Sequence, residues 1–127
     1  MKDINKWIGS GRIVRDAELK NANGTSFVSF SIAVNTVKKD GDAWVDEANF
    51  LDCTLWGKLG EALAEKMTKG REVFVEAEVK QRRWTDDSGK NQSKIGFKVE
   101  AIRLGAPPGA KPEPAKEQSF DDDIPPF

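Results

Sequence analysis

Residues 50–69, FLDCTLWGKLGEALAEKMTK, change their hydrophobic period within one stretch. Residues 44–56 predict a strand, because apolar and polar side chains alternate at its end. From Lys58 to Lys69 the apolar residues recur at helical spacing, and Gly70 follows where a helix cap is common. The strand face predicted to be buried carries Leu51, Cys53 and Leu55. The stretch therefore predicts a strand that leads into one short helix.

Shorter runs with turn residues between them precede this stretch. Residues 4–14 hold apolar side chains around Gly9 and Gly11, where a strand bends sharply or another backbone approaches closely. Asn23-Gly24 is a strong hairpin signal, and the alternating run 28–35 follows it. Two strands are therefore predicted before residue 44.

Two more strands are predicted after the helix. Residues 73–84 alternate, and residues 87–90 mark the tip of a long hairpin. The last strand, with Ile95, Phe97, Val99 and Ala101 in alternation, is predicted to close the sheet. Three strands, a helix and two further strands are the order of a five-stranded Greek-key barrel of the OB type. We therefore predict an all-β OB-fold barrel with one short helix.

All six prolines lie between Pro107 and Pro126, which divides the chain into a body and a tail. Residues 1–106, with 18 basic and 16 acidic side chains, are predicted to be the folded domain. Residues 107–119 are predicted to form a Pro-rich disordered linker, and residues 120–127 an acidic tip. The tail holds two basic and five acidic residues. A basic body with an acidic end suits binding of a polyanion while the tail addresses another partner.

The composition excludes several kinds of chemistry. The 127 residues include one cysteine and no histidine, so the commonest metal ligand and neutral-pH base are missing. Cys53 lies on the face predicted to be buried and is expected to be inert. Ordinary zinc, catalytic-triad and histidine-base chemistries are therefore almost closed off, and we predict no cofactor and no metal. Because no apolar run approaches the roughly 20 residues that span a bilayer, a cytoplasmic location is expected.

Aromatic side chains supply the candidate binding site. Phe50 and Trp56 share the strand face opposite the apolar one, so we expect them to be partly exposed. Trp84 directly follows two arginines, and Trp44 follows a loop with two lysines. Bases stack on exposed rings while nearby cations neutralise phosphates, which is how single strands are held without sequence readout. Each ring could instead fill a core or a subunit contact, and for Trp7 that interpretation is favoured.

Several motifs resemble, in order, those of the bacterial single-stranded DNA-binding proteins. The third strand and helix start read Phe50-Leu51-Asp52-Cys53-Thr54-Leu55-Trp56-Gly57-Lys58. The fourth strand and its hairpin read Arg82-Arg83-Trp84-Thr85-Asp86-Asp87-Ser88-Gly89. Further matches are residues 5–19, Asn23-Gly24, residues 30–35 and Lys69-Gly70. The resemblance covers nearly the full length of the chain.

The resemblance implies an OB fold assembled as a homotetramer, around which single-stranded DNA wraps during replication, recombination and repair. It implies no catalysis, and places the protein in the bacterial cytoplasm or nucleoid. By position, the base-stacking aromatics are Phe50, Trp56 and Trp84, and the basic positions on the wrapping path are Lys58, Lys69, Arg82 and Arg83. Residues 37–39 read Val-Lys-Lys where some members have another stacking aromatic, and Trp44 could substitute from across the loop.

The acidic tip is the most specific match. Members of this family end in an acidic run, an aliphatic residue, proline and a phenylalanine that docks into partner proteins. The corresponding residues are Asp121, Asp122, Asp123, Ile124, Pro125, Pro126 and Phe127. The second proline and the short linker depart from the family pattern. The resemblance implies recruitment of replication, recombination and repair proteins through this tip.

Two other functions remain compatible with the residues alone. An OB-fold RNA-binding or translation factor would share the barrel, but it gives no reason for the acidic, phenylalanine-ended tip. An enzyme subunit or adaptor would use the aromatics as a protein interface and would not protect single strands. Affinity for matched DNA and RNA strands separates the first from DNA binding, and protection of single strands separates the second.

Overall fold

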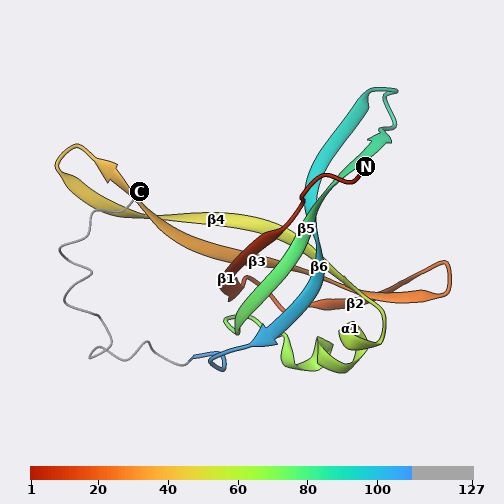
Figure 1. Cartoon of the computed structure of the whole chain (residues 1–127), viewed down its shortest axis with the longest axis horizontal. Coiled ribbons are helices and arrows are strands. Elements are labelled where there is room, and N and C mark those ends of the chain that lie inside the picture. Colours follow the sequence, from red (N-terminus) through yellow and green to blue (C-terminus); the bar gives the residue numbers. More distant parts are fainter. Residues whose placement is uncertain (110–127) are drawn as a thin grey trace.

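The computed structural model describes residues 1–109, and their regular structure is almost entirely β-strand (Figure 1). The strands are β1 (Trp7–Ile13), β2 (Glu18–Ala22), β3 (Thr25–Asp40), β4 (Ala43–Trp56), β5 (Glu72–Thr85) and β6 (Asn91–Leu104). Helix α1 (Lys58–Leu63) and the 3-10 turn η1 (Ala64–Lys66) lie between β4 and β5. Within residues 1–109, no helix is both long enough and apolar enough to cross a membrane. Most of the predicted linker and the whole predicted tip lie outside the described residues.

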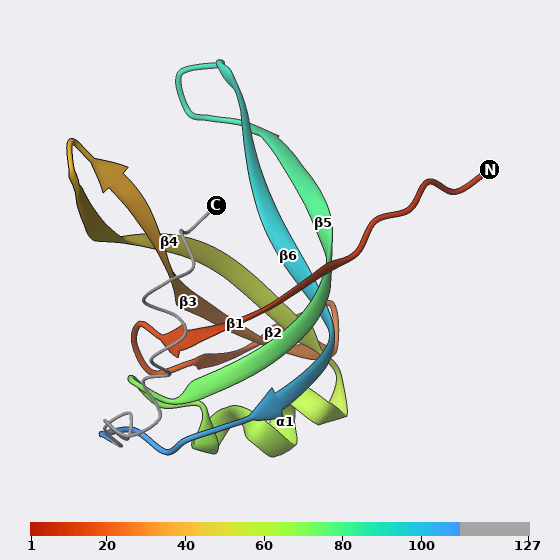
Figure 2. The same cartoon turned by 60° about the vertical axis from the view of Figure 1, so that its left-hand side comes forward.

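The sheet closes into a barrel because β1 has a neighbour on each side. The strand order is β1-β5-β6-β4-β3-β2, and Arg12 and Ile13 of β1 also pair with β3. Five strands therefore form a ring, and Figure 2 shows α1 at its lower end. The contact between β4 and β6 is parallel and the other contacts are antiparallel. The predicted five-stranded OB-fold barrel with one short helix is confirmed, and β2 adds a strand that the sequence pattern did not predict.

The core follows the alternation of apolar residues along the strands. Val28, Phe30 and Ile32 of β3 are buried, as are Cys53 and Leu55 of β4. The other buried apolar residues are Ile13, Met67, Val73, Val75, Ala77 and Val99. The Cys53 side chain is 1% exposed, and burial raises the pKa of its thiol to about 12. The predicted position of Cys53 in the core is confirmed, and the scarcity of thiolate at neutral pH is consistent with an inert thiol.

Two glycines of β1 allow the close contacts that the sequence predicted. A Cβ atom on Gly11 would lie 2.5 Å from the carbonyl oxygen of Ala33, where β1 crosses to β3. A Cβ atom on Gly9 would lie 2.5 Å from the Trp7 ring. That ring packs on the core and is tilted against Phe97, with ring centroids 5.2 Å apart. Trp7 therefore has the structural role that was favoured for it.

The helix is shorter than the predicted segment 58–69. The chain leaves η1 after Lys66, and Met67 turns into the core, where its side chain is fully buried. The Met67 carbonyl accepts a hydrogen bond from Ala17 N–H at 2.9 Å, and Gly70 N–H donates to the Ile13 carbonyl at 2.8 Å. Gly70 therefore bonds to the end of β1 instead of capping the helix. These tertiary hydrogen bonds end the helix earlier than its apolar spacing predicts.

The alternation of the last strand does not continue as far as Ala101. Ala77 pairs with Val99 and Glu76 pairs with Ala101, so Glu100 is an extra residue in β6. A bulge of this kind shifts the alternation by one residue. Ala101 is consequently exposed, and Ile102 packs against the core instead.

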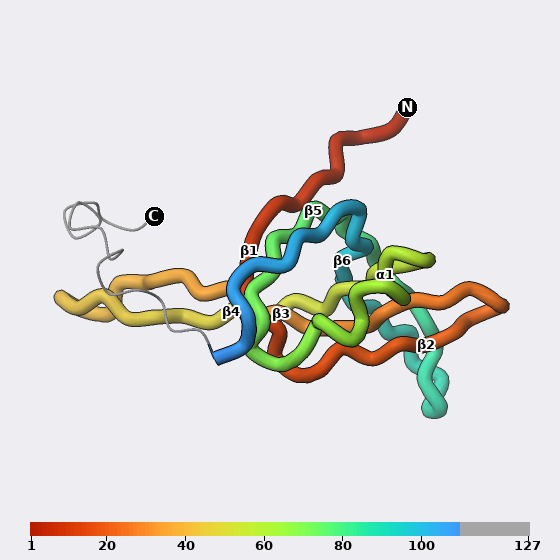
Figure 3. Tube along the Cα trace, turned by 90° about the horizontal axis from the view of Figure 1, so that it is seen from below, coloured from red at the N-terminus to blue at the C-terminus, as the bar shows by residue number. Residues whose placement is uncertain are grey.

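Two hairpins extend beyond the barrel. The β3–β4 hairpin and the β5–β6 hairpin point in different directions in Figure 1, and Figure 3 shows the β3–β4 hairpin opposite the β2–β3 hairpin. The β3–β4 hairpin turns at Gly41, which has a φ of 63°. Exposed strand pairs that leave a barrel in this way can contact a long ligand outside the ring itself.

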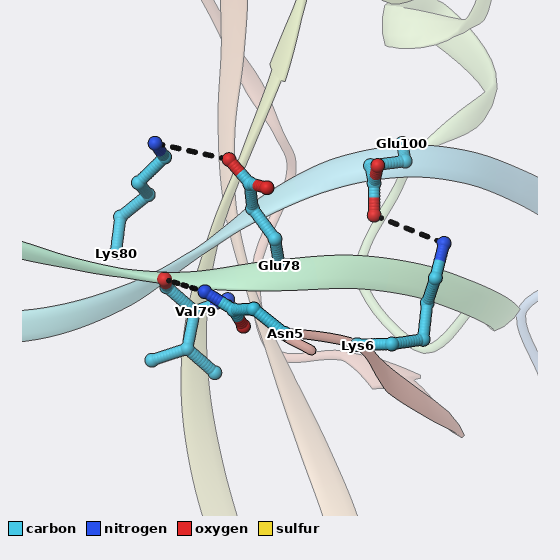
Figure 4. Close-up of polar contacts among 6 residues, drawn as sticks. All are labelled: Asn5, Lys6, Glu78, Val79, Lys80 and Glu100. Carbon is cyan, nitrogen blue, oxygen red and sulfur yellow. Dashed lines mark hydrogen bonds and ion pairs between the residues drawn. The ribbon is translucent and has the colours of Figure 1, made fainter. Parts of the chain in front are cut away.

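The segment before β1 is pinned to the outer edge of β5 (Figure 4). The Asn5 side chain donates to the Val79 carbonyl oxygen and accepts from Val79 N–H, both at 2.8 Å. Lys6 Nζ forms an ion pair with Glu100 Oε1 at 3.1 Å. The side-chain amide of Asn5 thus takes the place of a strand residue in the pairing with β5, at the point where the β5–β6 hairpin leaves the barrel.

Candidate nucleic-acid interface

The outer face of β4 carries a row of exposed aromatic rings. Because side chains alternate along a strand, even-numbered positions of β4 share one face while Cys53 and Leu55 point into the core. On this face the exposed fractions are 48% for Trp44, 67% for Phe50 and 41% for Trp56. The predicted exposure of Phe50 and Trp56 is confirmed.

Cross-strand contacts carry this face from β4 onto the β5–β6 hairpin. Asp52 forms an ion pair with Lys94 of β6, and Lys94 pairs with Arg82 of β5. Trp84 lies two residues beyond Arg82 on the same side of β5. Residues from the centre of β4 to the end of β5 therefore share one surface. We call it the aromatic face, and it comprises Phe50, Asp52, Trp56, Arg82, Trp84 and Lys94.

Arg82 and Trp84 form a stacked pair at the hairpin end of the aromatic face. The Arg82 guanidinium carbon lies 5.4 Å from the Trp84 ring centroid, and the indole remains 42% exposed. Arg83 points to the other side of the strand, where its Nη2 donates to Gln81 Oε1 at 2.7 Å. The two adjacent arginines therefore serve different surfaces, as strand alternation requires.

Phe27 is a neighbour of the site that the sequence analysis missed. It pairs with Trp56 across β3 and β4, and the two rings are tilted by 33° with centroids 4.6 Å apart. The signal that would have found it is the register of the β3–β4 hairpin, which turns between Asp40 and Ala43 and places Phe27 opposite Trp56. Phe27 supports one side of the Trp56 ring and leaves part of it open.

The remaining predicted site residues lie beside or away from the aromatic face. Lys58 begins α1 two residues after Trp56, and Lys39 Nζ lies 5.8 Å from the Trp44 ring centroid on the β3–β4 hairpin. Lys69 lies just before β5, at the opposite end of that strand from Trp84. The structure therefore brings together Phe50, Trp56, Trp84 and Arg82, and leaves Lys69 and Arg83 on other surfaces.

Asp52 introduces a negative charge into the aromatic face. It accepts a hydrogen bond from Ser31 Oγ at 2.6 Å and pairs with Lys94. Hydrogen bonds from Lys94 and Ser31 hold the pKa of Asp52 below its usual value, and the charge of Arg15 acts in the same direction. The carboxyl is therefore ionised at neutral pH.

The tip of the β5–β6 hairpin is organised by one carboxylate. Asp86 Oδ1 accepts from Ser88 Oγ at 2.7 Å, Ser88 N–H at 3.0 Å and Lys90 N–H at 2.9 Å. Its other oxygen accepts from Gln92 Nε2 at 2.9 Å. These bonds, led by that from the Ser88 hydroxyl, lower the pKa of Asp86 to about 2. The turn beside Trp84 is therefore held by charge-assisted hydrogen bonds.

Metal chemistry has no visible basis in the part of the chain that the structure describes. Residues 1–109 contain no group of three histidine, cysteine, aspartate or glutamate side chains placed to hold a metal ion.

The closed barrel and its aromatic, cationic outer face define an OB-fold barrel of the oligonucleotide-binding class.

Comparison with known proteins gives the family. The model of the single-strand binding protein family matches residues 4–104, and the chain belongs to that family. The single-stranded DNA-binding protein of Treponema pallidum is 41% identical over 105 residues, which are 82% of this chain and 59% of that protein. That of Borreliella burgdorferi is 35% identical over 106 residues, covering 82% and 71% of the two chains. The predicted family is confirmed, and the prediction of a non-enzymatic protein is confirmed by membership in a family of binding proteins.

A solved structure supports the fold independently. The Plasmodium falciparum SSB complex with ssDNA superposes with a TM-score of 0.75 and 18% sequence identity, covering 84% of this chain and 98% of that one. At this low identity the likeness bears on the fold alone.

Proposed function

We propose that this chain binds single-stranded DNA without sequence preference and protects it during replication, recombination and repair. One observation carries the proposal: the strand register gathers Phe50, Trp56 and Trp84 with Arg82 on a single continuous surface. Rings and cations on one surface can stack bases and neutralise phosphates at the same time. Membership in the single-strand binding protein family supports the same function.

The aromatic face is long enough to hold several nucleotides. Phe50 and Trp56 are six positions apart, which is about 20 Å along an extended strand. Each stacked base contributes roughly 1 to 3 kcal/mol, and stacking tolerates any base because every base has a π face. Phosphate contacts add affinity without reading sequence. The face is therefore suited to strands of any composition.

The proposed DNA path continues beyond the aromatic face. Lys58 extends it past Trp56, and Trp44 with Lys39 extends it along the β3–β4 hairpin. Lys69 and Arg83 lie on other surfaces of this one chain. We include them as phosphate contacts of a strand that wraps around a homotetramer, which is the assembly that the sequence resemblance implies.

We further propose that residues 120–127 recruit other replication, recombination and repair proteins in the bacterial cytoplasm or nucleoid. The support is the sequence of the tip, which joins Asp121, Asp122 and Asp123 to the aromatic ring of Phe127. A partner with a basic rim and an apolar pocket would match it.

Tryptophan fluorescence tests the DNA-binding function. Oligothymidine should quench the fluorescence of the full chain, because bases stack on Trp56 and Trp84, while a duplex of equal length should quench it weakly. The logarithm of affinity should fall with the logarithm of salt concentration, with a slope of roughly −0.7 for each phosphate neutralised. A matched RNA strand and a mass measurement of the free protein complete the test. Preference for the duplex would contradict the proposal, and a monomeric mass would contradict the tetramer.

A further inference from the structure

A carboxylate lies in the middle of the surface proposed to bind a polyanion. Asp52 is two residues from Phe50 and four from Trp56 on the same face of β4. Its partners come from the strands on both sides, because Ser31 belongs to β3 and Lys94 to β6. The other charged residues of this surface are positive. A residue that only filled space here would not need a negative charge.

The cations of the aromatic face are not equivalent. Within residues 1–109, neither Arg82 nor the adjoining Lys58 forms an ion pair, whereas Lys94 is paired with Asp52. Lys94 stands between Phe50 on β4 and the Arg82 and Trp84 pair on β5. The lysine closest to the centre of the surface is therefore the one that already has a fixed counterion.

A fixed carboxylate changes what Lys94 contributes to DNA binding. A phosphate that approaches a free lysine is neutralised, and small cations leave the DNA. A phosphate that approaches Lys94 also comes close to Asp52, so repulsion offsets the attraction. Because both side chains are about half exposed, the pair contributes little to the free energy of folding.

We propose that Asp52 limits the affinity for single-stranded DNA by holding Lys94 out of phosphate binding. This inference rests on the proposed function. The strand is then bound at the centre of the aromatic face by stacking on Phe50, and its phosphates are neutralised toward the ends. Asp52 is thus a residue that sets where the DNA backbone runs and how tightly it is held.

The test compares Asp52→Asn, Lys94→Gln and the double variant by oligothymidine titration over a range of salt concentrations. Asp52→Asn keeps an oxygen for the Ser31 hydroxyl and removes only the charge. It should bind on the order of fivefold more tightly at low salt, and the log-log salt slope should steepen by about 0.7, because one more phosphate is neutralised. Lys94→Gln should keep the slope of the unmodified chain, and the double variant should return to that slope.

Glu47→Gln is the matched control. Glu47 is also on β4 and pairs with a lysine, Lys38, at 3.5 Å, but it lies on the other face of the strand from Phe50. Glu47→Gln changes the net charge by the same amount as Asp52→Asn and should leave the log-log salt slope unchanged. Thermal melting of each variant should match that of the unmodified chain.

The possible results separate the inference from the proposed function. A lower slope for Lys94→Gln would show that Lys94 already binds phosphate and would overturn the inference. Unchanged or weaker binding by a folded Asp52→Asn would overturn it as well, while salt-dependent binding by the unmodified chain would leave the proposed function standing. Failure of the unmodified chain to bind oligothymidine would contradict the function itself.

Discussion

Phe50 and Trp84 reach solvent for different reasons. Phe50 is one residue out of phase with the core-facing Cys53 and Leu55, so the alternation that buries one face of β4 exposes the other. Trp84 lies where the β5–β6 hairpin has left the barrel, and from residue 79 to residue 85 both faces of β5 are exposed. A phenylalanine that is 67% exposed contributes little to the core, and its open ring is suited to contact with a ligand.

Trp84→Ala and Phe50→Ala should each weaken binding of single-stranded DNA by about 1 to 3 kcal/mol, because a stacked base loses its ring. Neither change should lower the melting temperature much. Trp7→Ala is the contrast: its ring packs on the core against Phe97, so it should reduce stability and leave the affinity of the folded chain intact. Oligothymidine titration and thermal melting on the same samples test this. Early melting with normal affinity in Trp84→Ala would assign Trp84 to the core.

Single residues also show where prediction from sequence succeeds and where it stops. The period of two located Phe50 and Trp56 on the exposed face, and Gly11 was correctly expected where another backbone passes closely. Phe27 and Asp52 were missed as parts of the site. Their roles depend on which residue of β3 or β6 stands opposite, and a single strand pattern does not contain that register.

Among the elements, the β5–β6 hairpin has the most local organisation. Its tip depends on Asp86, whose side chain accepts hydrogen bonds from Ser88, Lys90 and Gln92. A folded-state pKa of about 2 lies below the usual value of 3.8, so the ionised form favours the closed tip. That stabilisation is complete above about pH 4 and is lost as the pH falls through 2.

Asp86→Ala should loosen the tip and weaken single-strand binding roughly threefold, since the hairpin must then be ordered on binding. Amide hydrogen exchange of residues 84–92 should speed up in this variant. The neighbouring Asp87→Ala should change neither property, because no hydrogen bond of its side chain is present within residues 1–109. Equal exchange in both variants would show that Asp86 does not hold the tip.

The elements that departed from prediction did so through tertiary contacts. The apolar spacing of residues 58–69 is helical throughout, but hydrogen bonds from Ala17 and Gly70 draw the last part into the barrel. In β6 an extra residue, Glu100, reverses the faces of Ala101 and Ile102. Local patterns predicted both of these elements, whereas the end of the helix and the phase of β6 were decided by contacts with residues distant in sequence.

At the scale of the whole molecule, the basic body and the acidic tip are predicted to act separately. The three aspartates of the tip would repel DNA phosphate and compete weakly for the cations of the body. Deleting residues 120–127 should therefore leave single-strand affinity unchanged or slightly higher and should abolish recovery of partner proteins from a cell extract.

Two variants divide the tip by chemistry. Replacing Asp121, Asp122 and Asp123 together with asparagine should give the small gain in DNA affinity, while Phe127→Ala should lose partners with DNA binding unchanged. Equal partner recovery from the intact and shortened chains would refute the tip as a docking element. A large loss of DNA affinity on deletion would mean that the tip belongs to the binding surface.

The buried thiol of Cys53 offers a way to watch this barrel open. As the sole sulfhydryl in the sequence, it is sealed in the core with a pKa of about 12, so an alkylating reagent can reach it only after the strands separate. Its modification rate therefore reports the opening frequency of the native state. A cysteine introduced on either protruding hairpin would, by contrast, accept a fluorophore within minutes, leaving the native sulfur untouched and the chain singly labelled.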